Sequence, residues 1–106
     1  MNTDRERLEA AAKAAGYWSQ EFNCPANLPS LTWDPLTDDG DALRLAVKLG
    51  IDVSHNTFGN VIADHYALQD KRAVVLAHGI DPCAATRRAI VSLAAKMSPL
   101  PAVGAA

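Results

Sequence analysis

The stretch WDPLTDDGDALRLAVKLG, residues 33–50, carries the strongest structural signals in the chain. Its second half has apolar residues at the spacing of an amphipathic helix: Ala42, Leu45, Ala46 and Leu49. Carboxylates at the start of a helix accept hydrogen bonds from its free N–H groups and complement the helix dipole. The stretch therefore predicts a proline turn, then a helix over residues 38–49 capped by its own acids, with its end at Gly50.

Toward the N-terminus, Thr3 and Glu6 match a capping box and predict a helix over residues 3–15 that ends at Gly16. Residues 17–37 contain three prolines and favour a loop. The same residues hold four of the six aromatic side chains, namely Tyr17, Trp18, Phe22 and Trp33. We therefore expect an ordered loop that lies across the core.

Toward the C-terminus, three short segments of strand-forming residues are predicted at residues 51–56, 60–67 and 71–78. Asp81 and Pro82 open a final helix that Pro99 stops, and residues 98–106 are expected to be a flexible tail. Short connections between strands imply antiparallel pairing. The sequence thus predicts one α+β domain over residues 1–97, an α/β/α layered sandwich around a three-stranded antiparallel sheet, in the order α-α-β-β-β-α.

The composition excludes some classes of protein. The chain has 106 residues, a formal net charge of −2 and 49% hydrophobic residues, which suit one globular domain and not a general nucleic-acid binder. The charged N-terminus lacks the apolar segment of a secretory signal, and no apolar run is long enough to span a membrane. We expect a cytoplasmic protein with Cys24 and Cys83 reduced, a disulfide between them being the alternative.

Two groups of residues suggest metal or catalytic chemistry without a matching motif. Asp38, Asp39 and Asp41 could hold a divalent cation, but the chain lacks an EF-hand pattern and helix capping already accounts for them. His55, His65 and His78 could bind zinc or supply a general base, with His55 and His65 facing each other across a hairpin, or could simply be exposed strand residues. We predict no catalytic residue, no metal site and no cofactor.

The basic residues form two pairs: Arg44 with Lys48 on one predicted helix, and Arg87 with Arg88 at the start of another. Arginines near a helix N-terminus oppose the helix dipole, so they need either an internal acid or an anionic ligand. Asp81 or the acids of residues 38–41 could supply the internal partner. For the ligand alternative, the candidate binding residues are Trp33, Arg44, Lys48, Arg87 and Arg88, with Trp33 or Tyr66 stacking on a base.

The stretch of residues 33–50 resembles the phage ABA-sandwich domain family. These are small proteins of tailed phages and prophages with the pattern W-(N/D)-P-L-x-D-D-G-D-A-x-R-L-A-x-x-L. That pattern falls on Trp33, Asp34, Pro35, Leu36, Asp38, Asp39, Gly40, Asp41, Ala42, Arg44, Leu45, Ala46 and Leu49. The segments AAKAAGYW and AATRRAIVSLAAKM are also similar to the family's first and last helices. The resemblance implies an α/β/α fold and a phage or prophage origin, and it implies no established activity.

Three functions follow as hypotheses. The first is a non-enzymatic phage accessory protein that acts against host defence in the host cytoplasm, binding and sequestering an anionic small molecule such as a host nucleotide immune signal, within a homo-oligomer. The second is an interaction module for a host or phage protein, with Tyr17, Trp18 and Phe22 as anchors. The third is a metal-dependent phosphoesterase that uses the three acids and the histidines.

Overall fold

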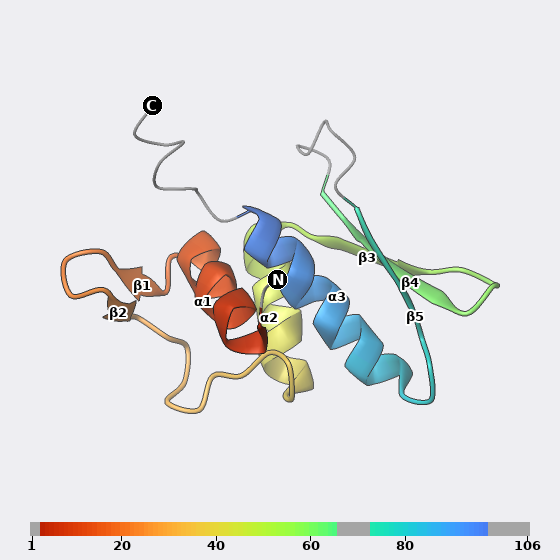
Figure 1. The fold of residues 1–106 in the computed structure, drawn as a ribbon, viewed down its shortest axis with the longest axis horizontal. Helices are drawn as coiled ribbons and strands as arrows, with labels where there is room; N and C mark the ends of the chain where they lie inside the picture. The colour runs from red at the N-terminus through yellow and green to blue at the C-terminus, as the bar shows by residue number, and fades with distance from the viewer. Residues whose placement is uncertain (1–2, 66–72, 98–106) are drawn as a thin grey trace.

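The computed structural model describes residues 3–65 and 73–97 (Figure 1). The elements are α1 (Asp4–Ala15), β1 (Trp18–Ser19), β2 (Cys24–Pro25), α2 (Asp39–Leu49), β3 (Asp52–His55), β4 (Asn60–Asp64), β5 (Val74–Ala77) and α3 (Pro82–Met97). The predicted α+β class, with three helices and a three-stranded antiparallel sheet, is confirmed. The short β1–β2 pair lies in the region predicted as loop, and the tail predicted at residues 98–106 lies outside the described residues.

The helices end where the sequence signals place them. Thr3 forms the predicted capping box with Glu6, and Gly16 adopts a left-handed conformation, φ 81°, that lets the chain leave α1. Asp38 is the N-cap of α2, its side chain accepting from the Asp41 N–H at 2.7 Å. Local capping groups therefore fix the bounds of the first two helices.

The three-stranded sheet has the order β3-β4-β5, and each strand pairs antiparallel with its neighbour in sequence. Val61 and Ala63 of β4 and Val74 of β5 are buried on the face that packs against α3. Residues of β3 on the same face, Val53 and His55, are exposed. The helical layer thus covers β4 and β5 and leaves β3 open.

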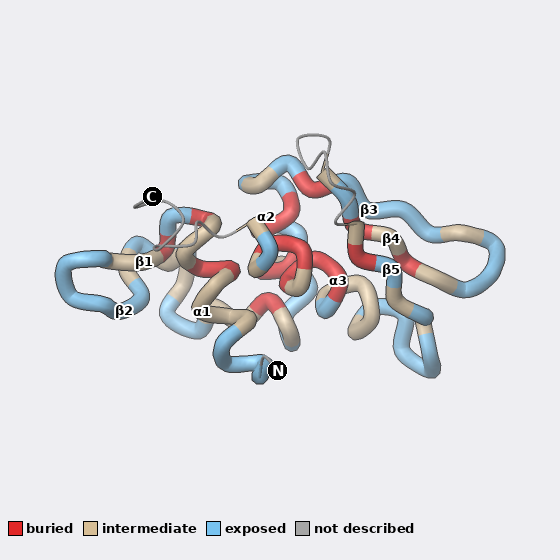
Figure 2. The backbone as a smooth tube through the Cα atoms, turned by 45° about the horizontal axis from the view of Figure 1, so that its top comes forward, coloured by how far each residue is buried: buried red, intermediate tan, exposed pale blue. Residues whose placement is uncertain are grey.

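The layering differs from the predicted α/β/α sandwich. α3 contacts β4 and β5, while α1 and α2 pack on α3 on the side away from the sheet, so all three helices lie on one side of the sheet (Figures 1 and 2). The other face carries Asp52, Ser54 and Asp64 beside Ile62 and Val75. A face with that many polar positions does not need a second layer of helix to bury it.

The core lies among the three helices and the inner face of the sheet. α3 runs through its middle and is buried on two sides, at Ala89, Ile90, Val91, Leu93 and Ala94. α1 contributes mainly the small side chains Ala11, Ala12 and Ala15. Within the described residues, no helix is long and apolar enough to cross a membrane.

Candidate functional site

The acids at the start of α2 are engaged in the fold. The Asp41 side chain is buried; its Oδ2 accepts from the Asp34 N–H at 2.8 Å and its Oδ1 accepts from Arg44 at 2.8 Å. Burial by itself raises the pKa of Asp41, but the Asp34 N–H and the Arg44 guanidinium outweigh it and leave the pKa below its usual 3.8. Asp41 thus ties the proline turn to α2, and of the three acids predicted to cap the helix, Asp38 has that role.

Gly40 makes room for this cluster. A Cβ atom at Gly40 would lie 3.2 Å from the terminal nitrogens of Arg44 and 3.2 Å from Asp38 Oδ2, which is tighter than ordinary van der Waals contact. The absent side chain therefore lets the Arg44 guanidinium fold back over the first turn of α2. The glycine in the DDGD sequence has a packing role here.

The other predicted cations also have internal partners. Arg87 donates to the Leu36 carbonyl at 2.8 Å and to Asp39 at 2.6 Å, and Arg88 forms a two-pronged pair with Asp4 at 2.9 and 3.1 Å. Lys48 Nζ lies 4.8 Å from the centroid of the Tyr17 ring. The hydrogen bond from Arg88 lowers the pKa of the Asp4 carboxyl. Arg87 pairs with one of the predicted acids, Asp39, whereas the partner of Arg88 is Asp4 and not one of the predicted acids.

Tyr66 lies outside the described residues, and the other residue predicted to stack on a base is Trp33. Its ring meets Tyr17 edge-on, with centroids 5.6 Å apart, and it borders a 300 Å³ cavity together with residues of α1. The Nε1–H groups of Trp33 and Trp18 are buried, and neither has an acceptor within the described part of the chain. Tyr17 is buried and Trp18 half-buried, so of the three predicted anchors only Phe22, 73% exposed, is free to reach a partner.

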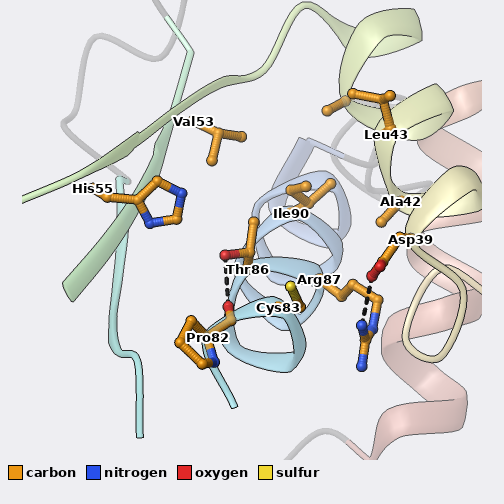
Figure 3. A pocket seen from close by; sticks show the side chains of 11 residues that line it. Asp39, Ala42, Leu43, Val53, His55, Pro82, Cys83, Thr86, Arg87 and Ile90 are labelled. Atoms are coloured by element: carbon orange, nitrogen blue, oxygen red, sulfur yellow. Dashed lines mark hydrogen bonds and ion pairs between the residues drawn. The ribbon is translucent and has the colours of Figure 1, made fainter. Parts of the chain in front are cut away.

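A larger groove of 440 Å³ lies between α2 and β3 with α3 as its floor. Figure 3 shows Leu43 and Ala42 reaching in from α2, Val53 and His55 from β3, and Ile90 and Thr86 from α3. The remaining lining residues are Asp39, Ala46, Pro82, Cys83 and Arg87. Of the five predicted binding residues, only Arg87 lines this groove. Trp33 and Lys48 come together elsewhere, where both contact the ring of Tyr17.

The groove is bordered by the outer edge of β3, which among the described strands pairs only with β4. The Asn56 N–H donates to the Asn60 carbonyl at 3.0 Å, and this fixes the alternation of bonds along the hairpin. In an antiparallel ladder every second residue bonds the partner strand and the others point away. The backbone groups of Asp52 and Ser54 therefore face β4, while those of Val53 and His55 face outward along the groove.

The histidines are arranged differently from the expectation. His55 Nδ1 lies 2.8 Å from His78 Nε2, and the strand register puts His65 beyond the Asp52–Asp64 pair at the opposite end of the hairpin. Across the described residues, no group of three or more His, Cys, Asp or Glu side chains could hold a metal ion. Cys24 and Cys83 are both exposed free thiols, and Cys83 lines the groove.

Sequence reasoning missed the groove because it forms where α2, α3 and β3 meet. One signal was available: Leu43 and Val47 are four residues apart on α2 and lie off its buried stripe, and both are exposed. Large apolar residues paired on the outer side of a helix often mark a contact surface.

Comparisons with protein-family models, with curated proteins and with solved structures found no match for this chain. The likeness to the phage ABA-sandwich family therefore rests on the motif residues alone.

Proposed function

We propose that the chain is a small non-enzymatic accessory protein of a phage or prophage, and that it binds an extended segment of another protein in the groove between α2 and β3. The observation that carries this proposal is the free edge of β3 beside an apolar groove. An extended segment can add to such an edge as a further strand, gaining main-chain hydrogen bonds while alternate side chains enter the groove.

The backbone geometry supports strand addition. Val53 and His55 turn their N–H and C=O groups outward, and the same two residues send their side chains toward the groove (Figure 3). A bound strand would therefore find hydrogen-bonding groups and apolar side-chain positions on one line. Leu43, 64% exposed on α2, forms the opposite wall.

The charges near β3 define the chemistry of the segment. Asp52 and Asp64 are directly opposite each other in the register, and both are exposed. Like charges in that position repel, so a lysine or arginine on an added strand would be favoured beside Asp52. The expected segment is extended, with apolar side chains at alternate positions and a basic residue on the face away from the groove.

We expect a host protein or another phage protein to supply this segment in the host cytoplasm. Edge strands with free hydrogen-bonding groups are usually protected in native proteins. β3 contains no proline, its four residues are all exposed, and in the part of the chain that the structure describes no helix covers it. Retaining such an edge is consistent with a strand-binding role.

A second candidate is sequestration of an anionic small molecule, such as a host nucleotide signal, at the same groove. Arg87 favours it because its guanidinium lies in the groove wall and pairs there with Asp39, whose side chain is 72% exposed. A phosphate could replace that carboxylate, since arginine forks bind phosphate in two places. Titration of the purified protein with a panel of cyclic and linear nucleotides in a calorimeter tests this candidate, which requires binding that Arg87→Gln removes.

Selection from a displayed library of random twelve-residue peptides tests the strand-binding proposal. We expect enriched peptides with alternating apolar residues and at least one lysine or arginine. Their binding should be lost in Val53→Pro, which removes an outward N–H on an edge where proline is tolerated, and in Leu43→Asp. Phe22→Ser is the control, because Phe22 is also apolar and exposed but lies in the β1–β2 connection.

The two free thiols report where a peptide sits. Bound peptide should slow alkylation of Cys83, which lines the groove, and leave Cys24 on β2 unchanged. Peptides that still bind Val53→Pro and Leu43→Asp, or that protect Cys24 and not Cys83, would refute the groove as the binding site. Melting curves of both variants confirm that a loss of binding is not a loss of fold.

A further inference from the structure

The pair formed by His55 and His78 lies at the end of the sheet where β5 leads into α3. We propose that these two imidazoles chelate a divalent transition-metal ion, with Cu²⁺ and Ni²⁺ preferred over Zn²⁺. The proposal rests on the 2.8 Å separation of His55 Nδ1 and His78 Nε2. His55 also lines the groove, so a metal and a bound segment would share that side chain.

The sheet holds the two rings together although the residues are distant in sequence. His55 is opposite Val61 in β4, Val61 is opposite Leu76 in β5, and the His78 N–H donates to the Gly59 carbonyl at 2.8 Å. Alternation along the strands puts both histidines on the face that carries Val61. Their ring nitrogens meet across β4, on a frame set by two strand pairings.

The separation of the nitrogens suits a particular coordination geometry. With metal–nitrogen bonds of about 2.05 Å, two nitrogens 2.8 Å apart subtend an angle of about 86° at the metal. This is close to the right angle between neighbouring ligands in square-planar and octahedral complexes. A tetrahedral ion would need the nitrogens about 3.3 Å apart. Copper and nickel, which favour tetragonal sites with nitrogen and oxygen ligands, fit better than zinc.

Metal binding requires both rings to turn, because in the present arrangement the two nitrogens point at each other. Their centroids are 5.0 Å apart with 44° between the planes, the nearly end-to-end arrangement of an N–H···N hydrogen bond. In that state one proton is shared between two nitrogens that are both potential metal ligands. His55 is exposed and His78 partly so, which leaves the rings room to turn until both lone pairs converge on one ion.

The ligand count narrows the class of metal. Because the described residues contain no group of three or more potential ligands, water would complete the coordination sphere. Magnesium and calcium prefer oxygen ligands, so two imidazoles do not suit them, and structural zinc sites use four protein ligands. A site with two imidazoles and open coordination positions is expected to exchange its metal with the solution. Its affinities for divalent transition metals should follow the general order, in which copper binds tightest.

Calorimetric titration of the untagged full-length chain with NiCl₂ and CuCl₂ tests the proposal, with Cys24→Ser and Cys83→Ser in every sample to remove thiol chemistry. His55→Gln and His78→Gln should each weaken binding at least about tenfold, because each removes an imidazole that the fold presents at high effective concentration. His65→Gln is the matched control and should change the affinity less than about twofold, since it lies at the other end of the hairpin.

Thermal melting supplies a second readout. A metal that joins β3 to β5 binds only the folded state, so NiCl₂ should raise the Tm of the parent and of His65→Gln and leave that of His55→Gln unchanged. The proposal is overturned if the parent binds neither metal. It is also overturned if His65→Gln loses as much affinity as the pair variants, or if the double variant His55→Gln/His78→Gln binds as the parent does.

Discussion

The start of α2 and strand β3 are both short, polar segments, yet the first is held by hydrogen bonds within the fold and the second is exposed. Asp41 and Arg44 are bound to each other and to the turn before the helix, and Asp38 caps the helix. β3 has four consecutive exposed residues, and one of its backbone edges pairs with none of the described strands. The comparison shows that the closely spaced opposite charges at the start of α2 bind each other within the fold. The sequence DVSH of β3 has no such pattern, yet it forms the exposed edge.

The largest effect on stability should come from comparing substitutions on the buried and exposed sides of α2. Leu45→Ala removes a fully buried side chain and should lower the free energy of unfolding by about 2–5 kcal/mol through lost burial and a cavity. Leu43→Ala, on the same helix but 64% exposed, should change it by less than about 0.5 kcal/mol. Urea unfolding followed by circular dichroism measures both, and equal losses would contradict the division of the helix into two sides.

A smaller loss is expected from Asp41→Asn. The amide keeps the shape but weakens the bonds to the Asp34 N–H and to Arg44, so unfolding should become easier by about 1–3 kcal/mol. Asp39→Asn changes an exposed carboxylate whose pair with Arg87 is partly solvated, so this variant should lose much less stability than Asp41→Asn. If the two variants unfold at the same urea concentration, the internal role assigned to Asp41 is wrong.

The pH dependence of stability distinguishes the same residue. Because the folded-state pKa of Asp41 is lowered, its contribution is fully present above the ordinary value of 3.8 and is lost as the pH falls through the lowered pKa. The pKa values of Asp4 and Glu6 are also lowered, by Arg88 and by Thr3, so the parent should lose stability in acid for several reasons. The difference between parent and Asp41→Asn should shrink below pH 3.8; a difference that stays constant would exclude the charge as its cause.

The smallest change is expected for Trp33→Phe. The substitution removes some packed ring surface, but it also removes a buried N–H that has no acceptor among the described residues, and the two effects oppose each other. We expect a net loss of less than about 1 kcal/mol in urea unfolding. A loss several times larger would indicate that the indole N–H does have an acceptor in the folded protein. The loop before α2 would then resemble the start of α2 in having its polar groups paired within the fold.

The features that could be predicted from the sequence are those set by neighbouring residues. The ends of α1 and α2 follow from Thr3, Gly16, Asp38 and Gly50, each of which acts within one helical turn. The three strands of the larger sheet and their antiparallel pairing follow from short connections, whereas the β1–β2 pair was not predicted. These signals need no knowledge of how the elements pack.

The features that could not be predicted depend on contacts between distant residues. Arg88 and Asp4 are 84 residues apart, so the partner of that arginine depended on how α1 packs against α3. The helices lie on one side of the sheet because the other face is polar, and the strand register that assigns residues to faces is not visible in the sequence. The groove follows from both, and so does the meeting of His55 with His78.

The link between Asp34 and Asp41 also bears on how the chain folds. All the hydrogen bonds that close this cluster join residues between Asp34 and Arg44. Short loops lose little entropy when they close, and helix formation is limited mainly by its first turn. The cluster supplies that first turn with side-chain bonds before any distant element has docked. α2 is therefore the segment expected to acquire structure early, with φ-values near Asp41 above those of β3.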